Sequence, residues 1–550
     1  MRQLFLLLIL STFINFTLSA QSNSTDSLQT ISEETSISTQ IDNWFAPAVN
    51  AMGEVLFFDP FTAMGIYDPV VRDKHNNVIL DLDGKPMEKH FPLIVLWLIF
   101  GAIYFTFRMK FISVRGVKHA LELLRGKYDN PTDKGEVSHF QALATAVSGT
   151  VGLGNIAGVA IAISVGGPGA TFWMIIAGLL GMSLKFTEVT LGVKYRTIDD
   201  DGNVSGGPMY YLTKALNKKN IGKINLGGLG KVLAVIYATL LIGASVGGGN
   251  MFQSNQTFKQ FEMIFPSLEG SGAWFGLGMA VIIGFVIIGG IKSIARVTEK
   301  IVPIMAILYI IASMVIIGMN YTEIPSVFML IIRGAFVPDA IYGGFIGVLI
   351  LGFQRASFSN EAGVGSASIA HSAVKTEEPV SEGLVALIEP VIDTVIICTM
   401  TALVIIFTGY SDPAMAHGYD GAQITSQAFA SVFPWFPYVL ATAITLFAFS
   451  TMISWSYYGL KGFRFLFGRY FDKAFGNPMA KRYTFFGIYL FFVVIGSASN
   501  LGSVMSFADM MILSMAFPNL IGLLILAPEV YKDMKSYMDR VKSGEVKKYR

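Results

Sequence analysis

The chain has 550 residues, of which 53% are hydrophobic and 14% are charged, whereas charged residues make up about 25% of an average soluble domain. This composition, together with apolar runs of membrane-spanning length from Phe91 onward, excludes a soluble enzyme and a membrane β-barrel and indicates a polytopic helical membrane protein. The formal net charge of +2 gives no indication of nucleic-acid binding, and the single cysteine, Cys398, excludes an intrachain disulfide bond and a cysteine-based metal cluster.

The N-terminus has the pattern of a secretory signal over residues 1–20. Arg2 precedes an apolar stretch, and Leu18-Ser19-Ala20 suits cleavage; an uncleaved anchor helix is the alternative. Residues 21–90 are then expected to form an extracytoplasmic extension. Its first part is rich in Ser, Thr and Gln and is expected to be disordered, whereas residues 46–90 are expected to form a small module with a hairpin at "HNNVILDLDGKP".

Hydropathy predicts eleven transmembrane helices within residues 91–535. Their approximate ranges are 92–108, 140–165, 168–187, 230–255, 273–290, 301–318, 326–354, 383–408, 436–458, 484–500 and 508–528. The stretch 326–354 is interrupted by "FVPDAIYGG" and is expected to be a short dip followed by a helix. Residues 536–550 are expected to form a basic cytoplasmic tail.

Positive charges fall on alternate loops of this prediction. Lys and Arg are abundant in loops 109–139, 188–229 and 459–483 and in the C-terminal tail, and they are absent from loops 319–325, 409–423 and 501–507. Because basic loops stay in the cytoplasm, we expect the N-terminus outside the membrane and the C-terminus inside. With the signal and the external extension, this favours the inner membrane of a Gram-negative cell and a periplasmic N-terminus.

Ten helices follow the first, and five helices per half is an odd number, so the two halves enter the membrane from opposite sides. A transporter built from inverted repeats requires this parity. The leading helix of the first half contains "GTVGLGNIAG", and that of the second contains "YGGFIG", Tyr342 to Gly347, followed by "GFQRASFSNEAGVG". Matching interruptions in the two halves indicate a ligand site near the middle of the membrane.

The stretch "VSGTVGLGNIAGVA", Val147 to Ala160, places glycines and an amide inside a predicted span. Glycine weakens a helix by about 1 kcal/mol relative to alanine, so an unwound segment is expected here. Free amides suit a carboxylate and free carbonyls suit Na⁺, and Asn155 both donates and accepts hydrogen bonds. The alternative is that the glycines only allow close helix packing, but the asparagine beside them favours a site.

Longer motifs resemble one family of transporters. They are "GEVSHFQALATAVSGTVGLGNIAGVAIAISVGGPGATFWM", "GGPMYYL", "GGGNMFQSN", "GGIKSIARVTEKIVP", "FSNEAGVGSASIAHSAVKT", "FAFSTMISWSYYG" and "FPNLIGLL". The run, over about residues 92 to 530, resembles the alanine or glycine:cation symporter family of the amino acid/polyamine/organocation superfamily. The resemblance implies an all-α, LeuT-like fold with a 5+5 inverted repeat of ten core helices and an additional N-terminal helix. It also implies sodium-coupled import of a small neutral amino acid, alanine or glycine, by alternating access.

The resemblance also implies the site residues. The implied substrate-binding residues are Gly152, Leu153, Gly154, Asn155, Gln253 and Trp455. The implied sodium ligands are Ser148 and Val151 through backbone oxygens and Ser450 and Thr451 through side chains. From the residues alone, Gln253 is placed at the outer end of an apolar helix, and Ser450 and Thr451 bond equally well to their own helix. A tryptophan such as Trp455 near a membrane end is more often an interface anchor.

Two features leave alternatives open. Many family members have threonine at the position of Leu153, so the amino-acid substrate is not fixed. Glu389 and Asp393 are four residues apart and are expected to share a helix face, so a shared proton and proton-coupled transport are the alternative to sodium; the favoured interpretation is that Asp393 bonds to backbone at a helix junction. A sensor or channel on the same fold is a more remote alternative. No catalytic cluster is apparent, so an enzyme is not expected, and the partners are the amino acid and the lipid bilayer.

Overall fold

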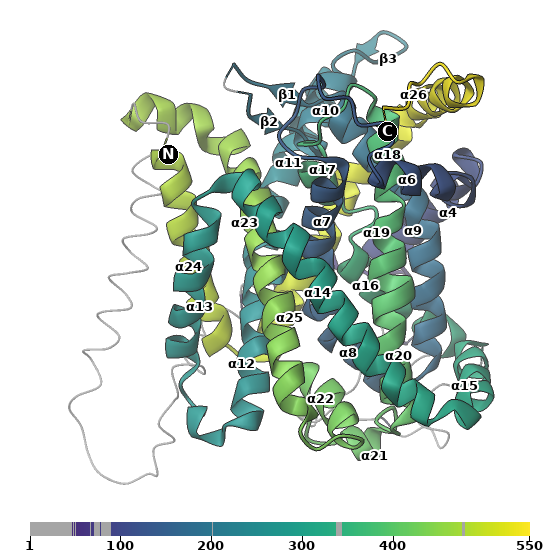
Figure 1. Ribbon diagram of the computed structural model, residues 1–550, viewed down its shortest axis with the longest axis vertical. Helices are drawn as coiled ribbons and strands as arrows, with labels where there is room; N and C mark the ends of the chain where they lie inside the picture. Colours follow the sequence, from purple (N-terminus) through teal and green to yellow (C-terminus); the bar gives the residue numbers. More distant parts are fainter. Residues whose placement is uncertain are drawn as a thin grey trace.

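The computed structural model describes residues 47, 49, 51–66, 68–70, 78, 90–200, 202–336, 344–475 and 479–549. The expected signal, the segment 21–45 and, except for Val78, the expected hairpin lie outside the described residues. Figure 1 shows long helices that run side by side through the molecule, with short helices at both ends and the hairpins at one of them.

The first part of the described chain contains helices and two short hairpins. Its helices are α3 (Pro60–Ala63), α4 (Leu93–Arg108), α5 (Ile112–Arg115), α6 (Val117–Leu124), α7 (His139–Thr150), the 3₁₀ turn η1 (Leu153–Asn155), α8 (Ala157–Gly166), α9 (Gly169–Lys194), α10 (Pro208–Leu216), α11 (Gly227–Val246), the π segment η2 (Gly247–Met251), α12 (Phe252–Ile264), η3 (Pro266–Leu268) and α13 (Gly272–Ile287). Strand β1 (Thr197–Ile198) pairs antiparallel with β2 (Val204–Ser205), and β3 (Asn220–Ile221) pairs antiparallel with β4 (Ile224–Asn225).

The rest of the described chain is built from helices joined by short loops. They are α14 (Gly290–Met319), η4 (Tyr321–Glu323), α15 (Ile324–Phe336), α16 (Gly344–Asn360), α17 (Ala367–His371), α18 (Pro379–Ala386), α19 (Ile388–Pro390), the π segment η5 (Val391–Cys398), α20 (Thr399–Phe407), α21 (Pro413–Ala416), α22 (Ala422–Ala430), α23 (Phe436–Phe475), α24 (Ala480–Ala498), α25 (Leu501–Ser514) and α26 (Ala516–Ser543). Thus every predicted span overlaps one or more of these helical elements, and the span 326–354 is described on either side of residues 337–343.

Long apolar helices confirm an all-α polytopic membrane protein. Within the described part of the chain, the helices long and apolar enough to cross a membrane are Gly169–Lys194, Gly227–Ile264, Gly290–Met319, Pro379–Phe407, Phe436–Phe475 and Leu501–Ser543. The pair His139–Thr150 and Leu153–Gly166 qualifies as one span with a 56° bend. Two shorter apolar helices, Leu93–Arg108 and Gly272–Ile287, fall at positions where spans were predicted. The total of eleven spans and the inverted repeat stay predictions.

The second glycine-rich helix, α16, has a break at its C-terminal end. Residues 337–343 lie outside the described chain, and from Gly344 onward α16 is continuous to Asn360. The break follows at Glu361, whose φ of 56° is left-handed, and at Gly363 and Gly365, both with φ of 90°. Only glycine adopts such angles without strain, so "NEAGVG" is the part of the quoted motif that ends the helix.

The two ends of the molecule differ in the way the charge pattern predicts. In Figure 1, α6, α10, the hairpins and the C-terminus lie at the upper end, and α15, α21 and α22 lie at the lower end. The loops rich in Lys and Arg are therefore gathered at one end, which is the arrangement expected if that end faces the cytoplasm.

Several polar side chains are buried inside the molecule, and rows of large apolar side chains are exposed on its surface. Helix α9 packs against α16, α18, α4 and α17, and its Lys185 and Glu188 are fully buried. By contrast, α13 and α14 expose rows of apolar side chains such as Phe285 and Ile304. This distribution suits a protein whose outer surface contacts lipid, because lipid chains solvate apolar groups and leave polar groups to find partners within the bundle.

The described part of the N-terminal extension packs over one end of the bundle. Asp59 accepts hydrogen bonds from Phe61 N and Thr62 N at the start of α3 and from Phe91 N at 2.7 Å, which anchors the extension to the chain just before α4. A Cβ atom at Gly53 would lie 3.4 Å from Met510 Sδ of α25. A cavity of about 810 Å³ lies here, and residues from Val49 to His90 line it together with Gln354, Ser506 and Asp509.

Candidate functional site

At the break between α7 and η1, two backbone amides donate to side chains instead of to helix carbonyls. Gly152 has an extended backbone, and its N–H donates to Asn155 Oδ1 at 2.8 Å. The next amide, Leu153 N–H, donates to Gln253 Oε1 at 3.0 Å. A Cβ atom at position 152 would overlap Thr451 Oγ1, so only glycine fits between the broken helix and α23. The predicted unwound segment is therefore present.

Gln253 reaches this break from the middle of a long helix. The π segment η2 contains Gly247, Gly248 and Gly249 and widens the helix just before Gln253, whose Nε2 donates to Gly248 O at 2.9 Å. The expectation that Gln253 lies at the outer end of its helix is therefore wrong. A π segment inserts an extra residue into the turn and frees a carbonyl, and here that carbonyl orients the glutamine amide.

Trp455 packs against the glycines of η2 and α7 rather than at a membrane interface. Its indole Nε1 donates to Gly149 O at 3.1 Å, and the side chain is 1% exposed. A Cβ atom at Gly249 would overlap the indole ring. The interpretation as an interface anchor is therefore excluded, and the indole is a wall of the central region.

A small cavity lies at the meeting point of these elements. It is lined by Gly149, Thr150, Gly154, Gly248, Gln253, Phe358, Glu361, Thr451, Trp455 and Ile512. Its volume of about 10 Å³ is room for about one water molecule, so a larger ligand requires these side chains to move apart. Gly154, Gln253 and Trp455 were expected at the substrate site and line this cavity, whereas the side chains of Leu153 and Asn155 do not.

Oxygen atoms gather where α7 meets α23. Ser148 Oγ donates to Ser450 O at 2.6 Å, Thr451 Oγ1 donates to Ser148 O at 2.9 Å, and Ser454 Oγ lies 3.0 Å from Ser148 Oγ. Ser450 Oγ instead donates to Phe447 O of its own helix. The expected sodium ligands Ser148 and Thr451 are thus in direct contact, and Val151 follows as the residue that ends α7.

Ser454 was not expected in this group. It lies four residues after Ser450 on α23, and residues with this spacing share a helix face. The spacing is therefore the sequence signal that places Ser454 near Ser148. Buried oxygen atoms from two helices form the type of environment that a hard cation such as Na⁺ prefers.

Asn155 joins the broken helix to η5. Its Nδ2 donates to Asp393 Oδ1 at 2.7 Å, and Asp393 also accepts from Ser359 Oγ at 2.9 Å and Thr394 Oγ1 at 2.7 Å. Asp393 was expected to bond to backbone, and that expectation is wrong because its carboxylate accepts these bonds from side chains. Glu389 and Asp393 have different partners, since Glu389 accepts from Lys185 Nζ at 2.9 Å.

The break after α16 supplies residues that the site prediction missed. Phe358, near the end of α16, and Glu361, just after it, line the central cavity together with Trp455. One turn earlier on α16, Arg355 forms an ion pair with Asp509 of α25, and its guanidinium lies 5.9 Å from the centre of the Phe358 ring. These contacts separate the central cavity from the larger cavity beneath the extension, which Gln354 and Asp509 line.

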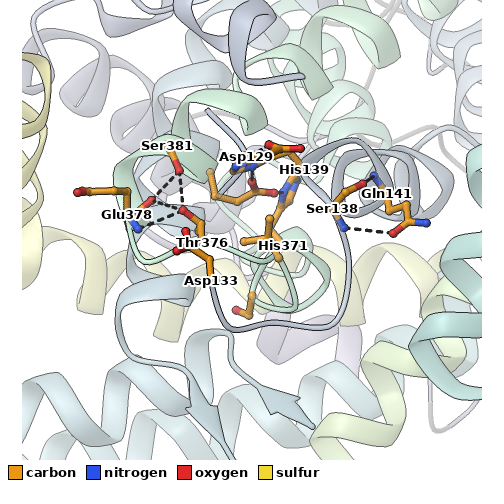
Figure 2. Close-up of polar contacts among 12 residues, drawn as sticks. Asp129, Asp133, Ser138, His139, Gln141, His371, Thr376, Glu378 and Ser381 are labelled. Atoms are coloured by element: carbon orange, nitrogen blue, oxygen red, sulfur yellow. Dashed lines mark hydrogen bonds and ion pairs between the residues drawn. The ribbon is translucent and has the colours of Figure 1, made fainter. Parts of the chain in front are cut away.

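Polar contacts close the opposite end of the broken helix. Arg196 donates to the carbonyls of Lys134, Ser372, Val374 and Thr376 at 2.5–3.0 Å, and burial lowers the pKa of its guanidinium. Figure 2 shows His139, Asp129 and His371 between the Ser138–Gln141 capping box and the group formed by Thr376, Glu378 and Ser381. The segment before α7 is thus fastened to the loop after α17, since Val137 also bonds with Ala373 and Lys375.

A buried polar centre on interrupted helices, closed by polar contacts on either side, defines a membrane transporter rather than an enzyme. The comparison with family models identifies which one: residues 75–550 match the sodium:alanine symporter family, and the chain belongs to this family.

Relatives with this sequence pattern cover most of the chain. The chain is 38% identical over 458 residues to the sodium/alanine symporter AgcS of Methanococcus maripaludis, which spans 83% of this chain and 96% of that protein. It is 37% identical to the probable sodium/glutamine symporter GlnT of Bacillus subtilis and 33% identical to the putative sodium/proton-dependent alanine carrier protein YrbD of the same organism, over 82% of this chain in each case.

Two solved structures resemble the fold more distantly. MhsT in complex with L-phenylalanine matches with a TM-score of 0.48 at 15% identity over 73% of this chain and 99% of that chain. A Na⁺-coupled sialic acid symporter matches with a TM-score of 0.48 at 11% identity over 80% of this chain and 98% of that chain.

Proposed function

We propose that this protein imports a small neutral amino acid, alanine or glycine, together with Na⁺ by alternating access across the inner membrane. The observation that carries the proposal is the break at Gly152. Two backbone amides there donate to side chains rather than to helix carbonyls, and they lie beside a cluster of buried oxygens. Sodium coupling is also the activity that the family's name and the name of the archaeal relative describe.

In this proposal the ion and the amino acid use neighbouring parts of the break. Na⁺ binds the oxygens of Ser148, Val151, Ser450 and Thr451, which fixes α7 against α23. The amino acid enters the cavity bounded by Gly154, Gln253 and Trp455, with its carboxylate toward the amides of Gly152 and Leu153. Asn155 and Gln253 accept hydrogen bonds from these two amides in the structure. When the amino acid binds, its carboxylate takes their place as the acceptor.

Coupling follows because each ligand favours the state that the other needs. A cation at the α7–α23 junction stabilises the bent segment, and an ordered segment presents its amides to the carboxylate at lower entropic cost. An inward Na⁺ gradient then drives uptake, and the membrane potential adds about 2.3 kcal/mol per charge per 100 mV.

The test is uptake of labelled alanine into proteoliposomes under an imposed Na⁺ gradient, with choline and a proton gradient as the comparison arms. We expect uptake that requires Na⁺. We expect Asn155→Ala to lower it by about tenfold or more, because each buried hydrogen bond left unmade costs about 1–3 kcal/mol. Asn320→Ala is the matched control, since the Asn320 side chain donates to Ile316 O within the end of α14.

Two results would contradict the proposal in different ways. Uptake driven by a proton gradient in the absence of Na⁺ would replace the coupling ion and favour the proton-coupled alternative. Absence of alanine and glycine uptake under every gradient, with transport of glutamine or another amino acid, would leave sodium coupling in place but change the substrate, and would direct attention to Leu153.

A further inference from the structure

Buried ionisable side chains form a continuous network on the inner side of the central cavity. Glu382 of α18 contacts the Nδ1 atoms of both His139 of α7 and His371 of α17, the latter at 2.5 Å. His371 Nε2 lies 3.6 Å from Glu389 Oε2, and Glu389 Oε1 accepts from Lys185 Nζ at 2.9 Å. His371, Glu382, Glu389 and Lys185 are all 0% exposed.

The network contains more carboxyl groups than basic groups. Glu188 and Glu361 also interact electrostatically with Lys185, and Asp393 interacts with Glu361 and Glu389. Five buried carboxyl groups therefore face Lys185, the two histidines and Arg196, which interacts electrostatically with Glu382, and Asp129 approaches His139 from the loop before α7 at 3.9 Å. Uncompensated charge inside a membrane protein is costly, so the network requires bound protons or cations.

His371 is the group whose geometry best accommodates such a proton. Within the described chain, His371 Nε2 and Glu389 Oε2 are both buried without a hydrogen-bond partner, and they face each other. A neutral imidazole donates from one nitrogen only, whereas a protonated imidazole donates from both. A proton on His371 therefore lets the ring donate to Glu382 on one side and to Glu389 on the other, which no neutral tautomer allows.

The same residues hold the inner end of the broken helix closed. Glu382 lies between His139 on α7 and His371 on α17, so it connects the broken helix to the segment that Arg196 fastens. If the inner side opens by movement of α7 away from α18, Glu382 loses His139 and the network meets water. Opening of the inner side and loss of a proton are therefore coupled events.

We propose that His371, held between Glu382 and Glu389, is a proton-binding site that is occupied while the inner side is closed and empties when that side opens. The proton leaves an imidazole nitrogen of His371 for water, and the neutral ring keeps the lone pair. Closing the inner side returns a proton to the same nitrogen. The inference deepens the proposed transport cycle and rests on it for its physiological role, but the site itself is independent of Na⁺ and amino acid.

The experiment measures inner-side opening without Na⁺ or amino acid. Thr376 is 5% exposed in the closed loop next to α18, so the thiol introduced by Thr376→Cys reports opening through its rate of reaction with a maleimide. The full chain is purified in detergent and labelled at several values between about pH 6 and pH 8, where a histidine titrates. The labelling rate of Thr376→Cys is divided by the labelling rate of the double variant Thr376→Cys, His371→Gln at each pH. This ratio cancels the effect of pH on the ionisation of the thiol itself.

We expect this ratio to rise with pH by up to about tenfold per unit, because a single proton opposes opening. His119→Gln is the matched control, since His119 is also buried at the inner end but contacts Tyr537 and Glu122 outside the network. In that background the pH dependence is expected to be unchanged. Glu382→Gln, which removes a carboxylate partner, is expected to flatten it as His371→Gln does and replaces that variant if His371→Gln does not fold.

A ratio that does not vary with pH would overturn the proton site, even if alanine uptake requires Na⁺. Conversely, absence of Na⁺-dependent uptake with a ratio that rises with pH would overturn the proposed transport function and keep the site. The two failures are therefore distinguishable.

Discussion

At Gly152, the absence of a side chain permits the contact on which the whole site depends. Thr451 Oγ1 approaches the space that a Cβ atom would fill, and Gln253 Oε1 lies 3.0 Å from the same position. The glycine cluster "GTVGLGNIAG" therefore predicts the break correctly, because helix weakness is a local property of the residues. The partners that stabilise the break, Gln253 and Thr451, come from distant elements, and only the family resemblance indicated them.

Gly152→Ala is expected to abolish Na⁺-dependent binding of alanine. The added methyl group forces Thr451 or the broken segment to move, at a cost of about 1–3 kcal/mol for overpacking, and it occupies the junction of the proposed ion and substrate sites. Gly158→Ala is the matched control, because a Cβ atom at position 158 meets nothing within 4 Å. Binding is measured by equilibrium with labelled alanine in detergent, and equal binding by the two variants would exclude the packing argument.

At the scale of elements, the π segment η5 explains why Glu389 and Asp393, which were expected to share a helix face, have different partners. Residues four apart share a face only in an α-helix, whereas η5, Val391–Cys398, has wider turns that rotate the residues after Glu389. Glu389 consequently contacts Lys185, and Asp393 contacts Asn155. The hydropathy of the sequence predicts this span, but no glycine marks the wider turn, so the direction of each carboxylate was not predictable.

The second break illustrates the same limit. Glycines at Gly343, Gly344 and Gly347 suggested an interruption; Gly343 lies outside the described residues, whereas Gly344 begins α16 and Gly347 lies within it, so Gly347 does not interrupt the helix. Gly363 and Gly365 have positive φ and do end the helix. Composition alone does not distinguish a glycine that packs from a glycine that turns.

Arg196 holds the loop before α7 against the loop after α17 with a geometry that lysine cannot reproduce. Its guanidinium reaches four carbonyls from two loops, whereas lysine has three donors on one nitrogen. Arg196→Lys is therefore expected to weaken closure of the inner side by about 1–3 kcal/mol. The thiol of Thr376→Cys should then react about tenfold faster with a maleimide. Arg469→Lys, at an exposed position on α23, is the control, and an equal rate in both variants would contradict this role for Arg196.

At the scale of the whole molecule, the membrane domain is more predictable than the extension. Its spans follow from hydropathy. A segment that crosses the bilayer must satisfy its backbone hydrogen bonds within a helix and needs a long run of apolar side chains to lie in lipid. The packing of residues 47–66 over α16 and α25 has no such signal, since its contacts depend on single residues such as Asp59 and Gly53. The archaeal relative aligns with 83% of this chain but 96% of its own length, so most of the unmatched sequence belongs to this chain.

The extension is expected to shield the end of α25 from solvent. Met510 is 2% exposed, and it lines the large cavity together with Gly53. In the purified chain, the thiol introduced by Met510→Cys should react slowly with a maleimide, and deletion of residues 47–66 should accelerate the reaction by about tenfold or more, because the local contacts that must open are then absent. Cys398, which is buried at the end of η5, should stay unreactive in both chains and reports intact folding of the bundle. If deletion leaves the reaction at Met510→Cys as slow as before, the other helices of the bundle shield position 510, and the extension does not cover this cavity.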